Sequence, residues 1–516
     1  MYSGEMQPSQ SVKVPSLETQ ARQFGAELEK RKYLVLSALT GLYGLGAALH
    51  ANGKPFWYDE IITLIVANSR DLGTAWKAAA ACDASPPLPH LLTHLCVRWL
   101  GDGEVAARIP AILGFWVFCL CMFRFTRRSV GIFYALAALL LPVATGAYSY
   151  AVEARAYGPE LAFSGLALVA WQTAAGRKGR LPALTLLALS VAAAIACQYY
   201  AVLLYLPLGG AEAFREWRAK RIDWGIWSAL AIGGVPLVWR LTLLLGAVRE
   251  SSHFWAVPYP QQAFEFWTEG LSPALAILVL FLALLTLTIL RPEKPDGGSE
   301  ASALFLAPHE LLAGLLFLAI PAAGVAGALL VTHVFTFRYA LIALVGFCLL
   351  LPMVAAYYFS GRSFPGFLLF AALTVGLVFQ AIDFPRARNP YENEPLLHDA
   401  LARGPVVIPD GQLFLQMWRY APEPLKSRIL YVTDSGAAVK YMGFDSLESG
   451  LRVLTPWSSV KVVEYRQFAL PGREFTVYQN TLRPGWLIPK IAAEGASLKV
   501  VGYRAYRALI EARLKP

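Results

Sequence analysis

Residues 54–63 read KPFWYDEIIT and follow directly on the first long apolar run of the chain. Three aromatic residues and two adjacent carboxylates, Asp59 and Glu60, therefore stand where a membrane helix should end. Aromatic side chains favour the headgroup level of a bilayer, which predicts that both carboxylates lie at a membrane face. Two interpretations are open at this point. Asp59 caps a helix that begins at Glu60, or the carboxylates act on a molecule held in the membrane.

The composition is that of a polytopic membrane protein. Of 516 residues, 56% are hydrophobic and only 16% are charged, and the mean hydropathy is +0.48. Soluble proteins rarely combine these values. The net charge of +10 does not indicate nucleic-acid binding, because the basic residues form short clusters between apolar runs, such as Lys30-Arg31-Lys32. Such clusters are typical of cytoplasmic loops, so we expect a multi-pass plasma-membrane protein whose partner is the lipid bilayer.

Hydropathy divides the chain into three parts. Residues 1–32 are predicted to form a cytoplasmic tail, residues 33–383 an all-α membrane domain of about eleven spans, and residues 384–516 a smaller outer domain. An odd number of spans, with more Lys and Arg in the proposed inner loops, places the N-terminus in the cytoplasm and the last domain outside. The expected spans are 33–51, 105–123, 130–147, 158–175, 181–196, 198–214, 225–243, 272–290, 310–330, 338–358 and 366–383.

The first outer loop, residues 52–104, lacks a continuous apolar run long enough to cross the membrane. Apolar residues at helical spacing instead predict two amphipathic helices on the outer membrane surface. One would carry Ile61, Ile65, Leu72 and Trp76 on a single face, and the other Leu88, Leu91, Leu92 and Leu95.

The last part of the chain is predicted to be a small α/β domain. Residues 405–410 and 428–434 read as buried strands that end in acidic turns, and residues 394–403 and 411–420 read as helices. Further strands are expected over 461–465 and 474–478.

Charged residues near the expected membrane are few, and four groups of them gather on the outer side. Each asks for an explanation, because a charge at the bilayer centre costs roughly 2.5–3.5 kcal/mol on insertion scales. Taken singly, Asp83 fits a turn, Glu153 fits a pair with Arg155, and Arg338 fits a snorkelling residue. Their gathering on one face indicates a functional site. The candidate residues are Asp59, Glu60, Asp83, Glu153, Arg155, Tyr157, Arg338 and Tyr339.

Two other features of the outer side point to structure. Arg108 lies one turn after Glu104, and we expect these two residues to pair. His90 and His94 have the spacing of half a metal site, but no HExxH motif or third ligand accompanies them. No metal site is predicted among these residues and no cofactor is expected, although a divalent metal, which nothing in the sequence indicates, remains an open alternative.

Five short motifs, in this order, resemble the GT-C superfamily of polytopic glycosyltransferases. The closest likeness is to bacterial relatives of the dolichyl-phosphate-mannose protein mannosyltransferases and the aminoarabinose transferases. The resemblance covers residues 33–383 and extends to the outer domain that many members carry. The motifs are Tyr58-Asp59-Glu60, Ser85-Pro86-Pro87-Leu88, Arg108-Ile109-Pro110, Glu153-Ala154-Arg155-Ala156-Tyr157 and Arg338-Tyr339.

The resemblance implies transfer of a sugar from a polyprenyl-phosphate donor to a lipid, glycan or protein acceptor outside the membrane, with inversion at the anomeric carbon. Asp59 is then expected to be the general base, supported by Glu60. Arg155 and Arg338 are expected to bind the phosphate, because a planar guanidinium suits phosphate oxygens. The same reading has Glu153 orient Arg155, has Tyr157 and Tyr339 contact sugar or phosphate, and adds Asp83 as a substrate-binding residue.

Two departures from the family pattern limit the choice of acceptor. Ser85 stands where the aminoarabinose transferases have Lys before the Pro-Pro pair, which puts lipid A in doubt as the acceptor. A Trp-Trp-Asp run typical of oligosaccharyltransferases is absent from the sequence, which disfavours transfer of a whole glycan to asparagine.

Two other function classes remain as alternatives. A transporter or flippase of polyprenyl-linked glycans should carry polar residues near the bilayer midplane on broken helices, often in two related halves. The sequence shows no such halves and gathers its polar residues at one face. A non-catalytic assembly protein, binding through its outer domain, would be favoured if Asp59 proved freely replaceable.

Overall fold

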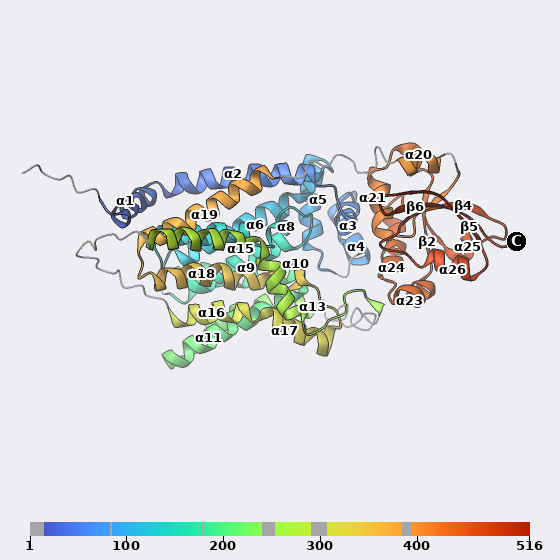
Figure 1. Cartoon of the computed structure of the whole chain (residues 1–516). Helices are drawn as coiled ribbons and strands as arrows, with labels where there is room; N and C mark the ends of the chain where they lie inside the picture. The colour runs from blue at the N-terminus through green and yellow to red at the C-terminus, as the bar shows by residue number, and fades with distance from the viewer. Residues whose placement is uncertain are drawn as a thin grey trace, which may run out of the picture.

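The computed structural model describes residues 15–82, 85–176, 179–239, 253–289, 307–383, 395–401 and 403–516. Figure 1 shows an elongated molecule in which a bundle of helices carries a smaller domain with a β-sheet at one end. The N-terminal helix α1 (Leu17–Lys30) lies at the other end of the bundle. The helices of the first loop lie between the bundle and the small domain.

The bundle consists of apolar helices, as the hydropathy predicts. Each expected span overlaps one helix or two to three consecutive helices. The elements are α2 (Lys32–Gly53), α6 (Glu104–Thr126), α7 (Ile132–Leu140), η1 (Leu141–Ala144), α8 (Tyr148–Ala151), α9 (Tyr157–Ala174), α10 (Arg180–Cys197), η2 (Tyr199–Leu204), α11 (Tyr205–Ala219), α12 (Trp224–Gly233), α13 (Val235–Trp239), α15 (Gln262–Ile289), α16 (Pro308–Leu318), α17 (Ile320–Gly327), η4 (Ala328–Thr332), η5 (Phe337–Ala343), α18 (Leu344–Tyr358) and α19 (Ser363–Ile382).

The all-α membrane architecture is confirmed, but the predicted number of spans is not. Within the described residues, 6 helices are long and apolar enough to cross a membrane. The pair α16 and α17, bent by 47°, raises the number to 7 if it forms one span. The expected span 158–175 falls on α9, which has 18 residues but is not among these 6 helices. The remaining expected spans fall on helices that are shorter or interrupted, such as α7 followed by η1.

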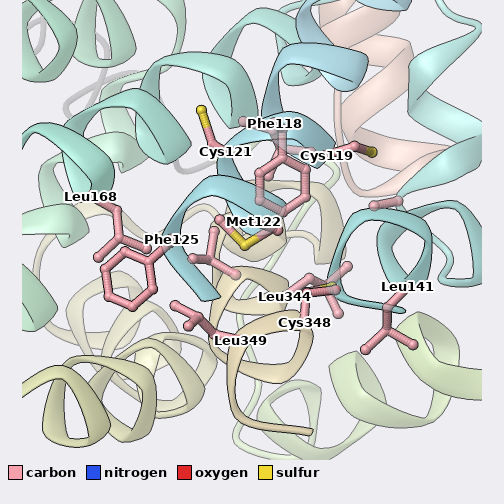
Figure 2. Packing of buried hydrophobic residues seen from close by; sticks show 14 of the residues in the cluster. Phe118, Cys119, Cys121, Met122, Phe125, Leu141, Leu168, Leu344, Cys348 and Leu349 are labelled. Atoms are coloured by element: carbon pink, nitrogen blue, oxygen red, sulfur yellow. The ribbon is translucent and has the colours of Figure 1, made fainter. Parts of the chain in front are cut away.

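Helix α6 lies at the centre of the bundle and packs against α2, α7, α9 and a helix of the first loop, α5 (Leu88–Leu100). Figure 2 shows Phe118 and Met122 of α6 in one apolar cluster with Leu344 and Leu349 of α18. These side chains are fully buried. The bundle therefore has a close-packed interior that provides a rigid base for the residues at its end.

Helices α6 and α9 touch backbone to backbone near the small domain. A Cβ on Gly158 would lie 2.3 Å from the carbonyl oxygen of Ala111, and one on Gly114 would lie 2.6 Å from the carbonyl carbon of Gly158. Only glycine allows so close an approach. This contact fixes the first turn of α9 against α6, and Arg155 lies just before that turn.

The first loop forms three helices, α3 (Tyr58–Ala67), α4 (Leu72–Cys82) and α5 (Leu88–Leu100). The prediction of one continuous surface helix through Ile61 and Trp76 is wrong, because residues 68–71 separate α3 from α4. Every residue of α3 except Asp59 is buried, so α3 is an interior helix.

Helix α5 was predicted correctly as a helix, but its buried face is not the leucine face. His90, Thr93, His94 and Val97 are buried, whereas Leu95 is 43% exposed. Leu88, Leu91 and Leu92 are half-buried, so the leucine face is partly turned away from the protein, as expected of a helix in contact with lipid.

The small domain contains a six-stranded sheet of order β3-β2-β1-β4-β6-β5. Strands β1 to β4 are parallel to one another, and β6 is antiparallel to β4 and β5. Its elements are α20 (Pro395–Leu401), β1 (Val406–Val407), α21 (Gly411–Tyr420), α22 (Glu423–Lys426), β2 (Ile429–Thr433), α23 (Ser435–Met442), α24 (Ser446–Leu454), η6 (Thr455–Trp457), β3 (Val462–Glu464), α25 (Tyr465–Phe468), β4 (Glu474–Asn480), α26 (Leu487–Ala493), β5 (Ser497–Arg504) and β6 (Arg507–Arg513).

The predicted α/β character of this domain is confirmed. The acidic turns after the first two strands act as helix N-caps, since Asp410 accepts from Gln412 N–H and Leu413 N–H, and Asp434 accepts from Ala437 N–H. The hairpin of β5 and β6 was not predicted. The proposed boundary at residue 384 lies outside the described residues.

The core of the small domain continues into the first loop. Phe56, Ile61 and Ile65 belong to the same buried cluster as Val406 of β1 and Phe414 of α21. Helix α3 is therefore packed between the bundle and the small domain, and the domain helps to hold the segment that carries Asp59.

The N-terminus is predicted to be cytoplasmic and the small domain extracytoplasmic, and their positions at opposite ends of the bundle agree with this (Figure 1). Alkaline phosphatase fused at Pro516 should be active, because this enzyme folds only outside the cytoplasm. Alkaline phosphatase fused at Pro292 or Arg362 should be inactive, because both positions are predicted to be cytoplasmic. A fluorescent protein that matures only in the cytoplasm should be fluorescent at the same two positions. An inactive phosphatase at Pro516 would show that the small domain is cytoplasmic and that the predicted orientation is wrong.

Candidate functional site

Three charged residues from distant parts of the chain meet at the end of the bundle beneath the small domain. Asp59 Oδ2 lies 3.0 Å from Arg338 Nη1 and 3.5 Å from Arg155 Nη2. Asp59 is in the first turn of α3, Arg155 precedes α9, and Arg338 is the second residue of η5. The three side chains are only 12–16% exposed, so bulk water screens these ion pairs weakly. The structure thus joins three of the predicted site residues.

The interpretation of Asp59 as a helix cap is wrong. Helix α3 begins at Tyr58 and its N-cap residue is Trp57, whose N–H donates to Glu60 Oε2 at 3.3 Å. The Asp59 carboxylate contacts the two arginines instead. A catalytic role for Asp59 stays a prediction, but helix capping is no longer an alternative explanation for this residue.

Glu60 and Arg108 form a fully buried, bidentate ion pair. Arg108 Nε and Nη2 lie 2.7 Å from Glu60 Oε1 and Oε2 respectively, and both side chains have zero exposure. The expected pair of Arg108 with Glu104 is therefore wrong. Two parallel charge-assisted hydrogen bonds are among the strongest polar contacts in proteins.

The Glu60–Arg108 pair also ties three backbone segments together. Arg108 Nη1 donates to the carbonyl oxygens of Ala51 and Lys54, each at 2.6 Å. Glu60 Oε1 accepts the N–H of Ala154 at 2.7 Å. Glu60 therefore connects the end of α2, the start of α3 and the segment before α9. The predicted support of Asp59 by Glu60 stays a prediction, and it would have to act through the backbone, since the Glu60 carboxylate is occupied by these donors.

Glu153 pairs with Lys54 and not, as expected, with the Arg155 side chain. Lys54 Nζ donates to Glu153 Oε1 at 2.7 Å, while the N–H of Arg155 donates to the carbonyl oxygen of Glu153, also at 2.7 Å. Burial raises the pKa of the Glu153 carboxyl, and the ammonium of Lys54 opposes that rise. Glu153 therefore fixes the turn that carries Arg155.

The two predicted tyrosines lie in aromatic pairs beside the arginines. Tyr157 is 1% exposed and meets the edge of Tyr150 at 5.0 Å between ring centres. Tyr339 stacks on Tyr200 at 4.9 Å. Their contact with a substrate stays a prediction. Asp83 lies outside the described residues.

Two tryptophans border Arg338, and the sequence did not predict this role for either. The guanidinium carbon of Arg338 lies 5.5 Å from the ring centre of Trp57 and 5.9 Å from that of Trp255. Arg338 Nε and Trp57 Nε1 are buried donors with no hydrogen-bond partner in the part of the chain that the structure describes. Buried donors normally have an acceptor, so an oxygen atom of a water molecule or a ligand is expected at both groups.

The small domain contacts the Asp59 segment through Tyr420, which the sequence also did not single out. The Tyr420 hydroxyl accepts the N–H of Phe56 at 2.7 Å and donates to Glu104 at 2.9 Å. Gln416 adds a hydrogen bond to the carbonyl oxygen of Phe56 at 3.3 Å. No local pattern links residues so far apart in sequence.

Nothing in the described part of the chain forms a metal site with three or more His, Cys, Asp or Glu residues. His94 hydrogen-bonds through Nδ1 to the carbonyl oxygen of Ala67 at 2.8 Å, which gives it a structural role in joining α5 to α3. The prediction that no metal takes part remains untested.

The chain resembles known proteins in part of its sequence and in its fold. Residues 84–239 match the family model described as dolichyl-phosphate-mannose-protein mannosyltransferase. No curated protein matches the chain. The crystal structure of ArnT from Cupriavidus metallidurans in the apo state is similar with a TM-score of 0.57 at 13% identity, over 94% of this chain and 98% of that one.

The structure of ArnT from the same organism bound to undecaprenyl phosphate gives a TM-score of 0.54 at 13% identity, over 93% of this chain and 97% of the other. The chain therefore has the ArnT fold over almost its whole length, small domain included. The predicted resemblance to the GT-C superfamily is confirmed by the family match and by this fold.

Proposed function

We propose that this chain is an integral-membrane glycosyltransferase that moves a sugar from a polyprenyl-phosphate donor to an acceptor outside the plasma membrane. The family match and the ArnT fold support the reaction class. The undecaprenyl phosphate in one ArnT structure supports the donor class. The observation that carries the proposal is Arg338, which holds the candidate base Asp59 and keeps a buried Nε–H without an acceptor among the described residues.

In the proposed reaction the donor phosphate binds to Arg338 and Arg155. A guanidinium presents parallel N–H groups that match two phosphate oxygens, and these donors stabilise the charge of the leaving phosphate. The phosphate competes with Asp59 for the same N–H groups. Donor binding therefore releases the Asp59 carboxylate from its ion pairs and makes it available as a base.

Asp59 then takes the proton of the acceptor hydroxyl. The hydroxyl oxygen forms a bond to the anomeric carbon as the bond from that carbon to the phosphate oxygen breaks. Polyprenyl phosphate leaves with the bonding electrons, and the anomeric configuration inverts. The donor is already an activated ester and the arginines supply positive charge, so this reaction needs no cofactor or metal. The acceptor can be a lipid, a glycan or a protein.

Arg338→Lys and Arg155→Lys test the phosphate role, because Lys keeps the charge but loses the planar fork. Each variant should lower kcat/KM for a polyprenyl-phosphate sugar at least about tenfold, since a hydrogen bond to a charged group contributes about 1.5–3 kcal/mol. Transfer is measured in proteoliposomes, and affinity for undecaprenyl phosphate in nanodiscs.

Arg127→Lys is the matched control. Arg127 makes a similar two-nitrogen contact with Glu29, which lies in α1 at the other end of the bundle. This variant should keep its transfer rate. If both site variants keep full activity, Arg155 and Arg338 have only a structural role and the proposed phosphate site is wrong.

A further inference from the structure

Trp57 and Trp255 form a pair around Arg338, although they come from different parts of the chain. Trp57 directly precedes α3. Trp255 lies in the segment 253–261, which leads into α15. The guanidinium lies over both indole rings, at 5.5 Å and 5.9 Å from their centres. The arginine assigned to the donor phosphate is therefore bordered by two aromatic surfaces.

The backbone around Trp255 is held in place by contacts with two other regions. The N–H of Phe335 donates to the carbonyl oxygen of Ala256 at 3.0 Å. The N–H of Asp445, the N-cap residue of α24, donates to the carbonyl oxygen of His253 at 3.3 Å. The Trp255 segment thus joins the chain that leads into Arg338 to the small domain.

Packing alone does not account for these two rings. Trp255 remains 48% exposed although it lies beside buried charged groups. The indole N–H of Trp57 is buried and has no acceptor within the described residues. A buried tryptophan normally finds a partner for this donor, because indole can only donate. The pair therefore offers exposed indole surface on Trp255 and an unused donor on Trp57 at the same arginine.

We propose that Trp57 and Trp255 form the subsite for the pyranose ring of the donor, which rests on the function proposed above. A pyranose has polarised C–H groups on its faces and hydroxyl oxygens on its rim. The C–H groups suit the negative face of an indole ring, and a rim oxygen suits the Trp57 N–H. A sugar attached to a phosphate on Arg338 lies one bond away from that phosphate, which places its ring beside these tryptophans.

The subsite is tested by comparing a lipid that lacks the sugar with lipids that carry it. Purified protein in nanodiscs is titrated with undecaprenyl phosphate and with its mannosyl, glucosyl and galactosyl esters, and dissociation constants are measured. Wild-type protein should bind at least one hexosyl ester more tightly than undecaprenyl phosphate. Trp255→Ala should weaken that ester about three- to tenfold, because an aromatic contact contributes about 0.5–1.5 kcal/mol. Its affinity for undecaprenyl phosphate should not change.

Two milder variants and one control make the result specific. Trp255→Phe keeps an aromatic face and should recover part of the loss. Trp57→Phe removes the N–H and should weaken only the hexosyl ester. Trp224→Ala removes a tryptophan of α12 that is 72% exposed, and should change neither affinity.

The possible outcomes separate the subsite from the proposed function. Equal weakening of both lipids by Trp255→Ala would mean that the ring holds the polyprenyl chain or only supports Arg338, and would overturn the subsite. So would unchanged binding of the hexosyl ester, or no hexosyl ester that wild-type protein prefers. Failure of the wild-type protein to bind undecaprenyl phosphate at all would instead count against the proposed function.

Discussion

Asp59→Asn is expected to lower the rate of sugar transfer at least about a hundredfold, because loss of a general base removes about 10²–10⁴ in rate. The amide is almost the same size as the carboxylate but cannot take the acceptor's proton. Affinity for undecaprenyl phosphate should be retained or should rise, since the side chain no longer competes for Arg338 and Arg155. Transfer and binding are measured on the same proteoliposome preparation.

Asp102→Asn is the matched control for loss of a carboxylate that pairs with arginine. Asp102 lies 3.0 Å from Arg419 and is half exposed, so its replacement should leave transfer unchanged. An Asp59→Asn protein that transfers sugar at nearly the wild-type rate would reduce Asp59 to an ion-pair partner. If the wild-type protein and Asp59→Asn both move polyprenyl-linked glycans across the bilayer at the same rate, the protein is the transporter of the alternative reading.

The sequence sufficed for features that depend on local hydropathy and on scarce charges. Apolar runs located the helices of the bundle, and the predicted helix 411–420 after the acidic turn at Asp410 coincides with α21, whereas the helix after Asp434 was not predicted. Asp59, Arg155 and Arg338 could be selected because a membrane protein carries few charges near its lipid-facing helices. Their mutual contact could only be expected in outline, since no pattern gives the distance between residues so far apart in sequence.

The errors have a common physical cause, which is burial by partners that are distant in sequence. Periodicity made α3 look like a surface helix, but the small domain covers its outer side. Helical spacing favoured Glu104 as the partner of Arg108, whereas the folded chain offers the buried Glu60. Trp57 was noted as an interfacial residue, and nothing local marked its contact with Arg338.

Arg108→Met is expected to have the largest effect on stability of any single change at the site. It leaves the Glu60 carboxylate buried without its counter-ion, which typically costs about 3–5 kcal/mol. It also leaves the carbonyl oxygens of Ala51 and Lys54 without their donor. The thermal unfolding temperature in detergent should fall clearly. Arg419→Met, at the half-exposed pair with Asp102, is the matched control and should shift it little.

Stability alone does not describe what this pair does, because Glu60 also binds the N–H groups of Trp57 and Ala154. Those residues adjoin the segments that carry Asp59 and Arg155, so a loosened pair should move both reacting groups. Arg108→Lys keeps the positive charge but not the fork, and it should retain folding better than Met. Its turnover at a temperature where it is folded should still fall about a hundredfold, the effect of misplacing catalytic groups by about 1 Å. Affinity for undecaprenyl phosphate should fall less than turnover. A folded Arg108→Lys protein with full turnover would show that the pair only stabilises the chain and does not position the site.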